Sequence, residues 1–519
     1  NTRAAPRGLK LLLIVIPIFI GALDLTVVSA VLPHVILDLE IPLQSGLDDA
    51  AWIVTGYLLA YSISMTFMGR LSDLVGRRRV YLIALAVFAL GSYLVAVGEG
   101  WPTQFALRIY YMVSSGRPDV SYVTLYILIA SRMIQAFGAG TMVPVGMAVV
   151  GDMYPEGQRA RPLGLIAAVD TAGWVVGHLY GGIIVRFWNW HTIFWLNLPI
   201  CFVSFLLIWW LLRRDKEDLG EGSMDWLGAL LITAGLSFLN IALGTGEESD
   251  LTSTLDQASD TSQSLFPLLI LGIGFLGLFV WRQAKARYPL IKLSLFKKPG
   301  YFPANLANFL IGVGLFIAIA NVPLFINSLV AETVEQGAWD SGWMLSALTV
   351  PMALAAVPGG WLTEKFGYRI PAIVGLVVAA AGFGLMSQWL ATTTYLQMIP
   401  QLMLTGVGFG LTLAPVAAAV VNSSPSEYRG TSSALVIIFR LIGMTVGVSG
   451  ITNYGLRRAD FLSKSLLPNS ATMAEIIQTG IRVMETVISE TFLIAGIFTI
   501  IALIPAYFIR TGTTKEMKE

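Results

Sequence analysis

Long apolar runs separated by short polar segments recur along the whole 519-residue sequence. A helix needs about 20 mostly apolar residues to cross the hydrocarbon core of a bilayer, and fourteen runs reach that length. They lie near residues 10–33, 50–69, 79–98, 121–150, 162–185, 192–212, 225–245, 264–284, 302–330, 341–362, 371–391, 395–421, 430–455 and 487–509. The sequence therefore predicts an all-α polytopic membrane protein with 14 transmembrane helices.

The composition excludes several other classes of protein. Only 13% of the residues are charged, about half the share that covers the surface of a soluble protein. A formal net charge of +1 and the lack of a basic patch interleaved with aromatic residues give no sign of a nucleic-acid partner. The single cysteine, Cys201, and three scattered histidines predict neither a disulfide nor a metal site. No cofactor is implied.

The distribution of basic residues predicts the orientation in the membrane. Cytoplasmic loops carry an excess of lysine and arginine. With the N-terminus placed inside, most of the 33 lysine and arginine residues fall in inside segments, including the run Arg77–Arg79. Because an even number of spans returns the chain to its starting side, both termini are predicted to be cytoplasmic.

A similar loop follows the second and the tenth predicted helices. Residues 69–79 and residues 360–369 both read Gly-x-x-x-acid-x-x-Gly with basic residues attached. Parallel repeats of this kind are a common plan of transporters. We therefore expect two six-helix bundles, over residues 1–215 and 291–519, with a two-helix insertion hairpin and a basic linker at 216–290.

These two loops are interpreted as a conformational hinge. Glycines permit tight turns and close helix approach, and an acid near a helix end can pair with basic residues in one conformation only. An anchor of positive charge on the inside would account for the arginines alone, but not for the glycines and the repeated acid. The hinge residues are Gly69, Asp73, Gly76, Arg77, Arg78, Glu364, Gly367 and Arg369.

Four charged residues stand out within predicted helices, namely Asp24, Arg132, Asp170 and Arg440. Such residues cost about 2.5–3.5 kcal/mol on insertion scales, so they are functional candidates by default. Asp24 is the expected proton carrier, because opening a cavity changes both the solvation of a carboxyl and its distance from an arginine. A static ion pair with Arg132 or Arg440 is the alternative.

The remaining polar residues allow two interpretations each. Arg132 is expected to organise protons in the cavity, and Asp170 either takes part in proton coupling or makes a structural hydrogen bond. Arg440 either gates the cavity and contacts the substrate or is structural. His178 titrates near neutral pH and could relay protons, although a lone histidine between helices is more often simply hydrogen-bonded.

Several motifs together resemble the major facilitator superfamily, specifically its fourteen-span drug:proton antiporters. The loop at 69–79 matches the signature loop between helices two and three, and the run Arg132–Gly140 matches the fourth-helix motif. Further matches are residues 21–33, 190–199 and 225–228. The resemblance implies transport by alternating access, with helices one and four lining a central cavity.

One motif departs from that family. The fifth-helix motif of the antiporters ends Gly-Pro-x-x-Gly-Gly, whereas this chain has His178 in place of the proline. The glycines that allow close helix packing remain, and they are Gly173, Gly177, Gly181 and Gly182. Strict exchange of drugs for protons is therefore less strongly implied.

A narrower resemblance points to the mycobacterial triacylglyceride exporters. It rests on the runs Arg440–Gly447 and Leu467–Ala471. It implies a lipid substrate, a periplasmic lipoprotein partner and the cytoplasmic membrane of a bacterium. Residues 455–488 favour helix, so we expect a helical hairpin that projects from the outer face and turns at Leu467–Ser470.

The loop between the third and fourth spans, at 99–120, is aromatic. Trp101, Phe105, Tyr110 and Tyr111 lie among apolar residues, and aromatic side chains prefer the headgroup layer. A short interfacial helix that contacts membrane lipids and an ordinary loop are the two interpretations.

A transporter is the function class that these patterns favour. The sequence holds no Walker loop, metalloprotease helix or nucleophile elbow, and a receptor would not need duplicated gating loops. We expect proton-coupled export of lipids of the triacylglyceride or glycolipid type. A multidrug:proton antiporter for lipophilic or cationic compounds is the alternative.

Overall fold

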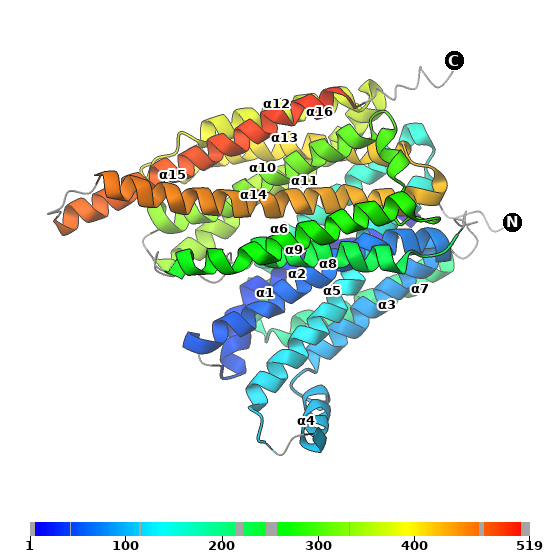
Figure 1. Ribbon diagram of the computed structural model, residues 1–519, viewed down its shortest axis with the longest axis horizontal. Coiled ribbons are helices and arrows are strands. Elements are labelled where there is room, and N and C mark those ends of the chain that lie inside the picture. Colours follow the sequence, from blue (N-terminus) through cyan, green and yellow to red (C-terminus); the bar gives the residue numbers. More distant parts are fainter. Residues whose placement is uncertain are drawn as a thin grey trace.

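The computed structural model describes residues 6–41, 43–113, 116–212, 222–244, 257–331, 333–466 and 472–509. These residues form a bundle of long helices, and none of those described is in a strand. The start of α1 and the end of α16 lie at the same end of the bundle (Figure 1). That end also holds the two glycine-rich loops, and it is called the inner end below.

Each of the fourteen predicted segments coincides with one long helix. In the first half these are α1 (Arg7–Asp38), α2 (Leu43–Val75), α3 (Arg77–Ala96), α5 (Val120–Met153), α6 (Ala160–Phe187) and α7 (His191–Leu212). The insertion holds α8 (Trp226–Gly244) and α9 (Gln257–Lys285). The second half holds α10 (Tyr301–Phe325), α11 (Val334–Phe366), α12 (Arg369–Met386), α13 (Tyr395–Asn422), α14 (Arg429–Leu466) and α15 (Met473–Ile501).

Short elements complete the described part of the chain. They are α4 (Trp101–Val113), α16 (Leu503–Tyr507) and the single turns Glu156–Gln158, Leu293–Lys297, Ile326–Val330 and Ser426–Tyr428. Twelve helices in the described residues are long and apolar enough to cross a membrane, and α8 adds a shorter apolar stretch at Trp226–Leu239. The all-helical membrane fold is therefore confirmed, while the count of fourteen spans and the cytoplasmic termini stay predictions.

The two six-helix groups share one pattern of neighbours. In the first group α1 packs on α6, α2 on α5, and α3 on both α5 and α7. In the second group α10 packs on α14, α11 on α13, and α12 on both α13 and α15. Between the groups the contacts are reciprocal, because α6 packs on α11 and α14 packs on α2. The same pattern of helix contacts is thus repeated in the two groups.

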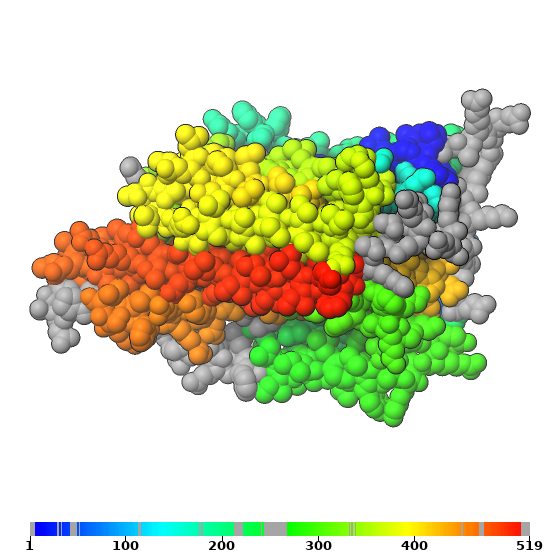
Figure 2. Space-filling view, turned by 90° about the horizontal axis from the view of Figure 1, so that it is seen from above, coloured from blue at the N-terminus to red at the C-terminus, as the bar shows by residue number. Residues whose placement is uncertain are grey.

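The last two long helices extend beyond the rest of the bundle. Helix α14 has 38 residues, which is about 57 Å at a rise of 1.5 Å per residue and exceeds a core of about 30 Å. Figures 1 and 2 both show α14 and α15 reaching past the other helices at the outer end. Glu490 joins the two helices by accepting hydrogen bonds from the Tyr454 hydroxyl (2.6 Å) and the Arg458 guanidinium (2.8 Å). The predicted turn at Leu467–Ser470 lies outside the described residues.

The aromatic segment at 99–120 contains a helix. Helix α4 has 13 residues, and it runs across the direction of the long helices in Figure 1. Trp101, Phe105 and Tyr111 are more than half exposed. A helix is therefore present where the sequence allowed either a helix or a loop, and its contact with membrane lipids stays a prediction.

Close packing of α1 against α6 depends on glycine, which gives a first testable prediction. A Cβ atom at Gly177 would press on the Thr26 hydroxyl and the Leu23 carbonyl oxygen, whereas one at Gly182 would meet nothing within 4 Å. Overpacking costs about 1–3 kcal/mol. Gly177→Ala is therefore expected to lower the melting temperature in detergent, measured by size exclusion after heating, and Gly182→Ala is the matched control. Equal melting of the two variants would contradict this packing role.

Candidate functional site

A buried polar cluster lies between α1 and α5 in the first half. Asp24 on α1 is 0% exposed and forms an ion pair with the Arg132 guanidinium on α5. The same guanidinium donates to the Asp24 backbone carbonyl (3.1 Å) and to Gln135 Oε1 (2.6 Å). Amide nitrogens of Gln135 (3.1 Å) and of Asn197 on α7 (3.3 Å) donate to Asp24 Oδ1. The carboxylate on α1 is thus held by side chains of two other helices of the same half, α5 and α7.

Aromatic rings enclose the arginine of this cluster. The Arg132 guanidinium carbon lies 4.1 Å from the Tyr57 ring centroid and 5.6 Å from that of Phe194. Cation–π contacts of this kind stabilise a desolvated guanidinium by about 2 kcal/mol. The rings also exclude water, so the charge on Asp24 is the main counter-charge of Arg132. A change in the protonation of Asp24 therefore changes the energy of the whole cluster.

A second buried ion pair joins the two halves at mid-depth. Arg440 Nη2 on α14 lies 3.5 Å from Asp170 Oδ2 on α6, and the two side chains are 11% and 5% exposed. Among the described residues, Asp170 Oδ1 and Arg440 Nε have no hydrogen-bond partner. Partly satisfied charges in a medium of low dielectric constant are costly. This pair is therefore suited to separate when the halves move.

The first glycine-rich loop holds the inner end of the two halves together. Asp73 accepts hydrogen bonds from the backbone N–H groups of Gly430 (2.9 Å) and Thr431 (3.1 Å), in the first turn of α14. An anion at a helix N-terminus is stabilised by the helix dipole and by unsatisfied N–H groups. Arg77 donates to Asp73 (2.8 Å) and forms an ion pair with Asp152 of α5. The loop acid thus belongs to one half and binds a helix end of the other.

Glycines and a further arginine shape this loop. Gly76 has a φ of 110°, which a residue with a Cβ rarely adopts. A Cβ atom at Gly69 would collide with the Gly430 carbonyl of α14, so glycine allows the two backbones to approach. Arg78 donates to the Trp209 carbonyl of α7 (3.1 Å), within the first half.

The second loop makes the reciprocal contact. Glu364 forms an ion pair with Arg161 at 2.5 Å and accepts a hydrogen bond from the Arg161 backbone N–H (3.3 Å) at the start of α6. Gly367 has a φ of 78°. Arg369 does not take part in this ion pair, because its guanidinium lies 3.2 Å from the Tyr507 ring centroid of α16. Each loop acid therefore caps the fifth helix of the opposite half.

Polar residues that the sequence analysis did not single out extend the inner contact. Asn422 of α13 accepts from Arg159 (2.8 Å) and donates to the Tyr368 hydroxyl (2.6 Å). Burial, and after it the charge of nearby Arg429, lower the pKa of Arg159 to about 10, so Arg159 keeps its charge at neutral pH. Burial raises the pKa of Tyr368, which stays a neutral phenol.

Two missed residues of the Asp24 cluster lay inside motifs that had been recognised. Gln135 is the fourth residue of the run Arg132–Gly140, and Asn197 lies in the run 190–199. A single neutral amide changes the hydropathy of an apolar run only slightly, so hydropathy does not reveal it. Its place within an apolar motif is the signal that predicts a buried hydrogen-bond partner. Ser92 also belongs to the cluster, since its hydroxyl accepts from Gln135 at 2.8 Å.

The four glycines of the fifth-helix motif differ in how closely neighbouring helices approach them. Cβ atoms at Gly173 and Gly177 would collide with α1, Gly181 is buried, and Gly182 has open space. His178 lies in α6, but its side chain is outside the described part of the structure. In the residues that the structure describes, no group of three histidine, cysteine or acidic side chains could hold a metal ion.

Two like helical halves that are joined by ion pairs across their seam are the architecture of a membrane transporter. The chain belongs to the Major Facilitator Superfamily, whose family description it matches over residues 14–448 and 304–519. The fold agrees, with a TM-score of 0.60 to the proton:xylose symporter XylE at 13% identity over 97% of this chain and 96% of that chain.

Curated relatives cover most of the chain. The triacylglyceride transporter of Mycobacteroides abscessus is 29% identical, over 85% of this chain and 81% of the relative. The triacylglyceride transporter Rv1410c of Mycobacterium tuberculosis is 28% identical, over 94% and 90%. The multidrug transporter protein MdtP of Bacillus subtilis is 29% identical, over 90% and 79%. The chain is therefore a multi-pass bacterial membrane transporter and not an enzyme.

Proposed function

We propose that the protein exports lipids of the triacylglyceride or glycolipid type from the cytoplasmic membrane by proton-coupled alternating access. A lipid cargo is supported by the extension of α14 and α15 beyond the bundle. It is also supported by the mycobacterial relatives, which are triacylglyceride transporters. A drug-sized cargo released into water needs no such extension. A lipid leaving a bilayer does, because its acyl chains must stay covered.

The extension carries apolar side chains suited to that task. Leu456 is 41% exposed, Phe461 61%, Leu466 52% and Ile477 57%. Exposed apolar patches mark contacts with other apolar surfaces. We assign to this surface the acyl chains of the cargo and, at its tip, a periplasmic lipoprotein that accepts them.

Proton coupling is supported by the Asp24 cluster. Protonation of Asp24 removes the counter-charge of Arg132 inside a dry, aromatic environment. Asp24 lies on α1, and α1 packs against Gly173 and Gly177 of α6. Helix α6 also carries Asp170, which forms the ion pair between the halves. A proton on Asp24 can thus bias the position of α6, and with it the closure of the cavity.

The contacts of the two glycine-rich loops close the inner end of the bundle. Asp73 and Glu364 hold the inner end closed through two helix N-termini. These bonds must break before cargo can enter from the inner side, so opening costs several hydrogen bonds, which re-form on closure in each cycle. Such bistable contacts are a common device of switching proteins.

Reconstitution tests the function directly. In proteoliposomes with an imposed pH gradient, movement of a fluorescent triacylglyceride is expected to exceed that in empty liposomes, and collapsing the gradient with an ionophore should abolish it. A cationic dye serves as the competing cargo. Transport of the dye without transport of the lipid would establish the alternative, a multidrug:proton antiporter, which the Bacillus subtilis relative favours.

Shortening the outer hairpin separates the two cargo classes. Removal of residues 461–486, with a short glycine–serine linker in their place, keeps the Arg458–Glu490 ion pair that joins α14 and α15. Triacylglyceride export is expected to fall about tenfold, the effect of a barrier raised by 1.4 kcal/mol, while any dye transport is unchanged. Equal loss or equal retention of both activities would remove the proposed role of the extension.

A further inference from the structure

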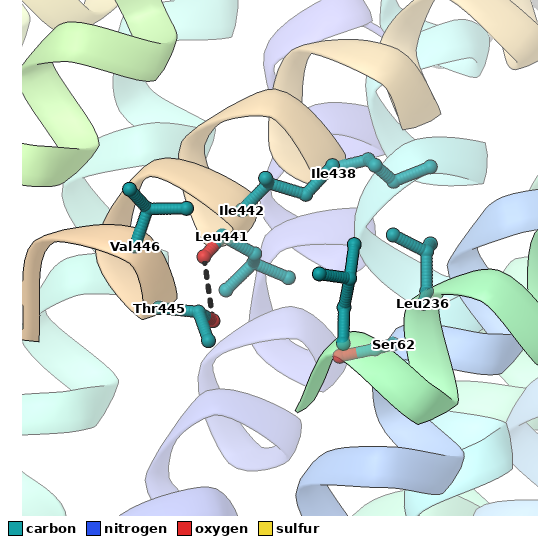
Figure 3. Close-up of a pocket in the computed structure, with 8 residues that line it drawn as sticks. Ser62, Leu236, Ile438, Leu441, Ile442, Thr445 and Val446 are labelled. Atoms are coloured by element: carbon teal, nitrogen blue, oxygen red, sulfur yellow. Dashed lines mark hydrogen bonds between the residues drawn. The ribbon is translucent and has the colours of Figure 1, made fainter. Parts of the chain in front are cut away.

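An apolar groove lies on the outside of the bundle where the two halves meet. It is lined by Ser62 of α2, Leu236 and Leu239 of α8, and Ile438, Leu441, Ile442, Thr445 and Val446 of α14 (Figure 3). About 430 Å³ of space free of protein atoms lies between these residues, and part of it is open to the outside. The groove therefore has one wall from each half and a third wall from the insertion hairpin.

The groove faces away from the ion pairs described above. On α14 its residues recur three or four positions apart, so they share one helical face. Arg440 lies on the opposite face, since Ile438 and Ile442 are each about 200° around the helix from it at 100° per residue. The groove is thus separate from the pair of Arg440 with Asp170.

The depth of the groove excludes a lipid headgroup. Ile438 and Val446 lie about 14 and 26 Å from the start of α14 at a rise of 1.5 Å per residue, which places the groove in the outer half of a core of about 30 Å and within its apolar part. Its lining holds no charged residue, and its polar atoms are the hydroxyls of Ser62 and Thr445. The Thr445 hydroxyl donates to the Leu441 carbonyl at 3.0 Å (Figure 3). Only an apolar ligand suits such a lining.

The groove is continuous with the surface that contacts the bilayer. Val446 at its rim is 40% exposed, and on the insertion hairpin Leu230 of α8 is 64% and Ile273 of α9 58% exposed. Bilayer chains therefore reach the groove without crossing a polar barrier. Helix α8 contacts both α2 and α14, so the hairpin covers the seam instead of lying apart from it.

We propose that this groove binds one acyl chain of a bilayer phospholipid, which stays resident in the seam between the halves. The insertion hairpin is then the element that forms the site, because α8 supplies Leu236 and Leu239. The occupant fills space between α2 and α14, two helices whose contact must change when the halves rock. This proposal does not depend on the identity of the transported cargo.

Photolabelling in nanodiscs tests it. The full chain is placed in phosphatidylglycerol that carries a diazirine on one acyl chain, and the labelled residues are mapped by mass spectrometry. Labelling of Leu239, Ile442 and Thr445 is expected to exceed that of Leu230 and Ile273 about tenfold, as a binding preference of 1.4 kcal/mol gives. Even labelling of both sets would overturn the proposal.

Filling the groove supplies the matched comparison. Leu236→Trp is expected to remove most labelling of Ile442 and Thr445, whereas Leu230→Trp on the exposed face of α8 leaves it unchanged. Thr445→Phe does the same from α14 if Leu236→Trp fails to fold. Unchanged labelling in a folded, filled variant would overturn the site, and displacement of the label by added triacylglyceride would overturn a resident phospholipid.

Discussion

Asp24→Asn is expected to abolish transport driven by a pH gradient while exchange of labelled for unlabelled cargo without a gradient persists. The amide keeps the size of the carboxylate but can neither bind nor release a proton. It also leaves Arg132 without its counter-charge inside the cluster of Tyr57 and Phe194. Loss of one partner of a buried pair costs about 3–5 kcal/mol, so the variant is also expected to melt at a lower temperature.

Two further variants make this result specific. Asp38 lies on the same helix, where its carboxylate accepts a hydrogen bond from the Trp190 indole N–H (2.8 Å) outside the Asp24 cluster, so Asp38→Asn should keep gradient-driven transport. Combining Asp24→Asn with Arg132→Gln removes both charges, and it should recover much of the stability but none of the coupling. Gradient-driven transport by Asp24→Asn at the wild-type rate would place the proton site elsewhere.

The sequence was most informative where physical chemistry is local. Runs of apolar residues located the fourteen long helices of the described residues. The composition of 455–488 favours helix, and α14 and α15 cover the described part of it, with a capping box of Thr472 and Glu475 at the start of α15. Hydropathy locates only the part of a helix that crosses the bilayer, whereas caps and packing determine where the helix ends. Helices can therefore continue beyond the hydrophobic spans. Helix α14 therefore reaches Leu466, about three turns past the predicted span.

Partners of charged residues depend on tertiary packing, and here the sequence left choices open. Asp24 could have paired with Arg132 or with Arg440, and the contact of α1 with α5 selects Arg132. Glu364 was expected to pair with basic residues that the sequence did not identify, and its partner is Arg161 of the opposite half. No local pattern records which helix lies across the seam, so these pairings could not be read from spacing.

The ion pair of Asp170 with Arg440 is expected to control the relative populations of the closed and open states of the two halves. Asp170→Asn or Arg440→Gln leaves one buried charge without its partner in the closed state described here. Because that costs about 3–5 kcal/mol, each single variant should shift the population toward a state in which the halves part and water reaches the remaining charge. Transport slows in both, since the cycle must pass through the closed state.

Spin labels at Gln158 and Lys365, exposed residues of opposite halves at the inner end, measure this shift as a longer distance, in a background that carries Cys201→Ala. The double variant Asp170→Asn with Arg440→Gln removes both charges, so its distance distribution should return toward that of the wild type, with a coupling energy of about 0.5–3 kcal/mol. Arg458→Gln breaks an ion pair within the outer hairpin and should leave the inner distance unchanged. Additive effects of the two single variants would show that the pair does not act as a unit, and closure would then rest on the contacts of the inner end, those of Asp73 and Glu364 among them.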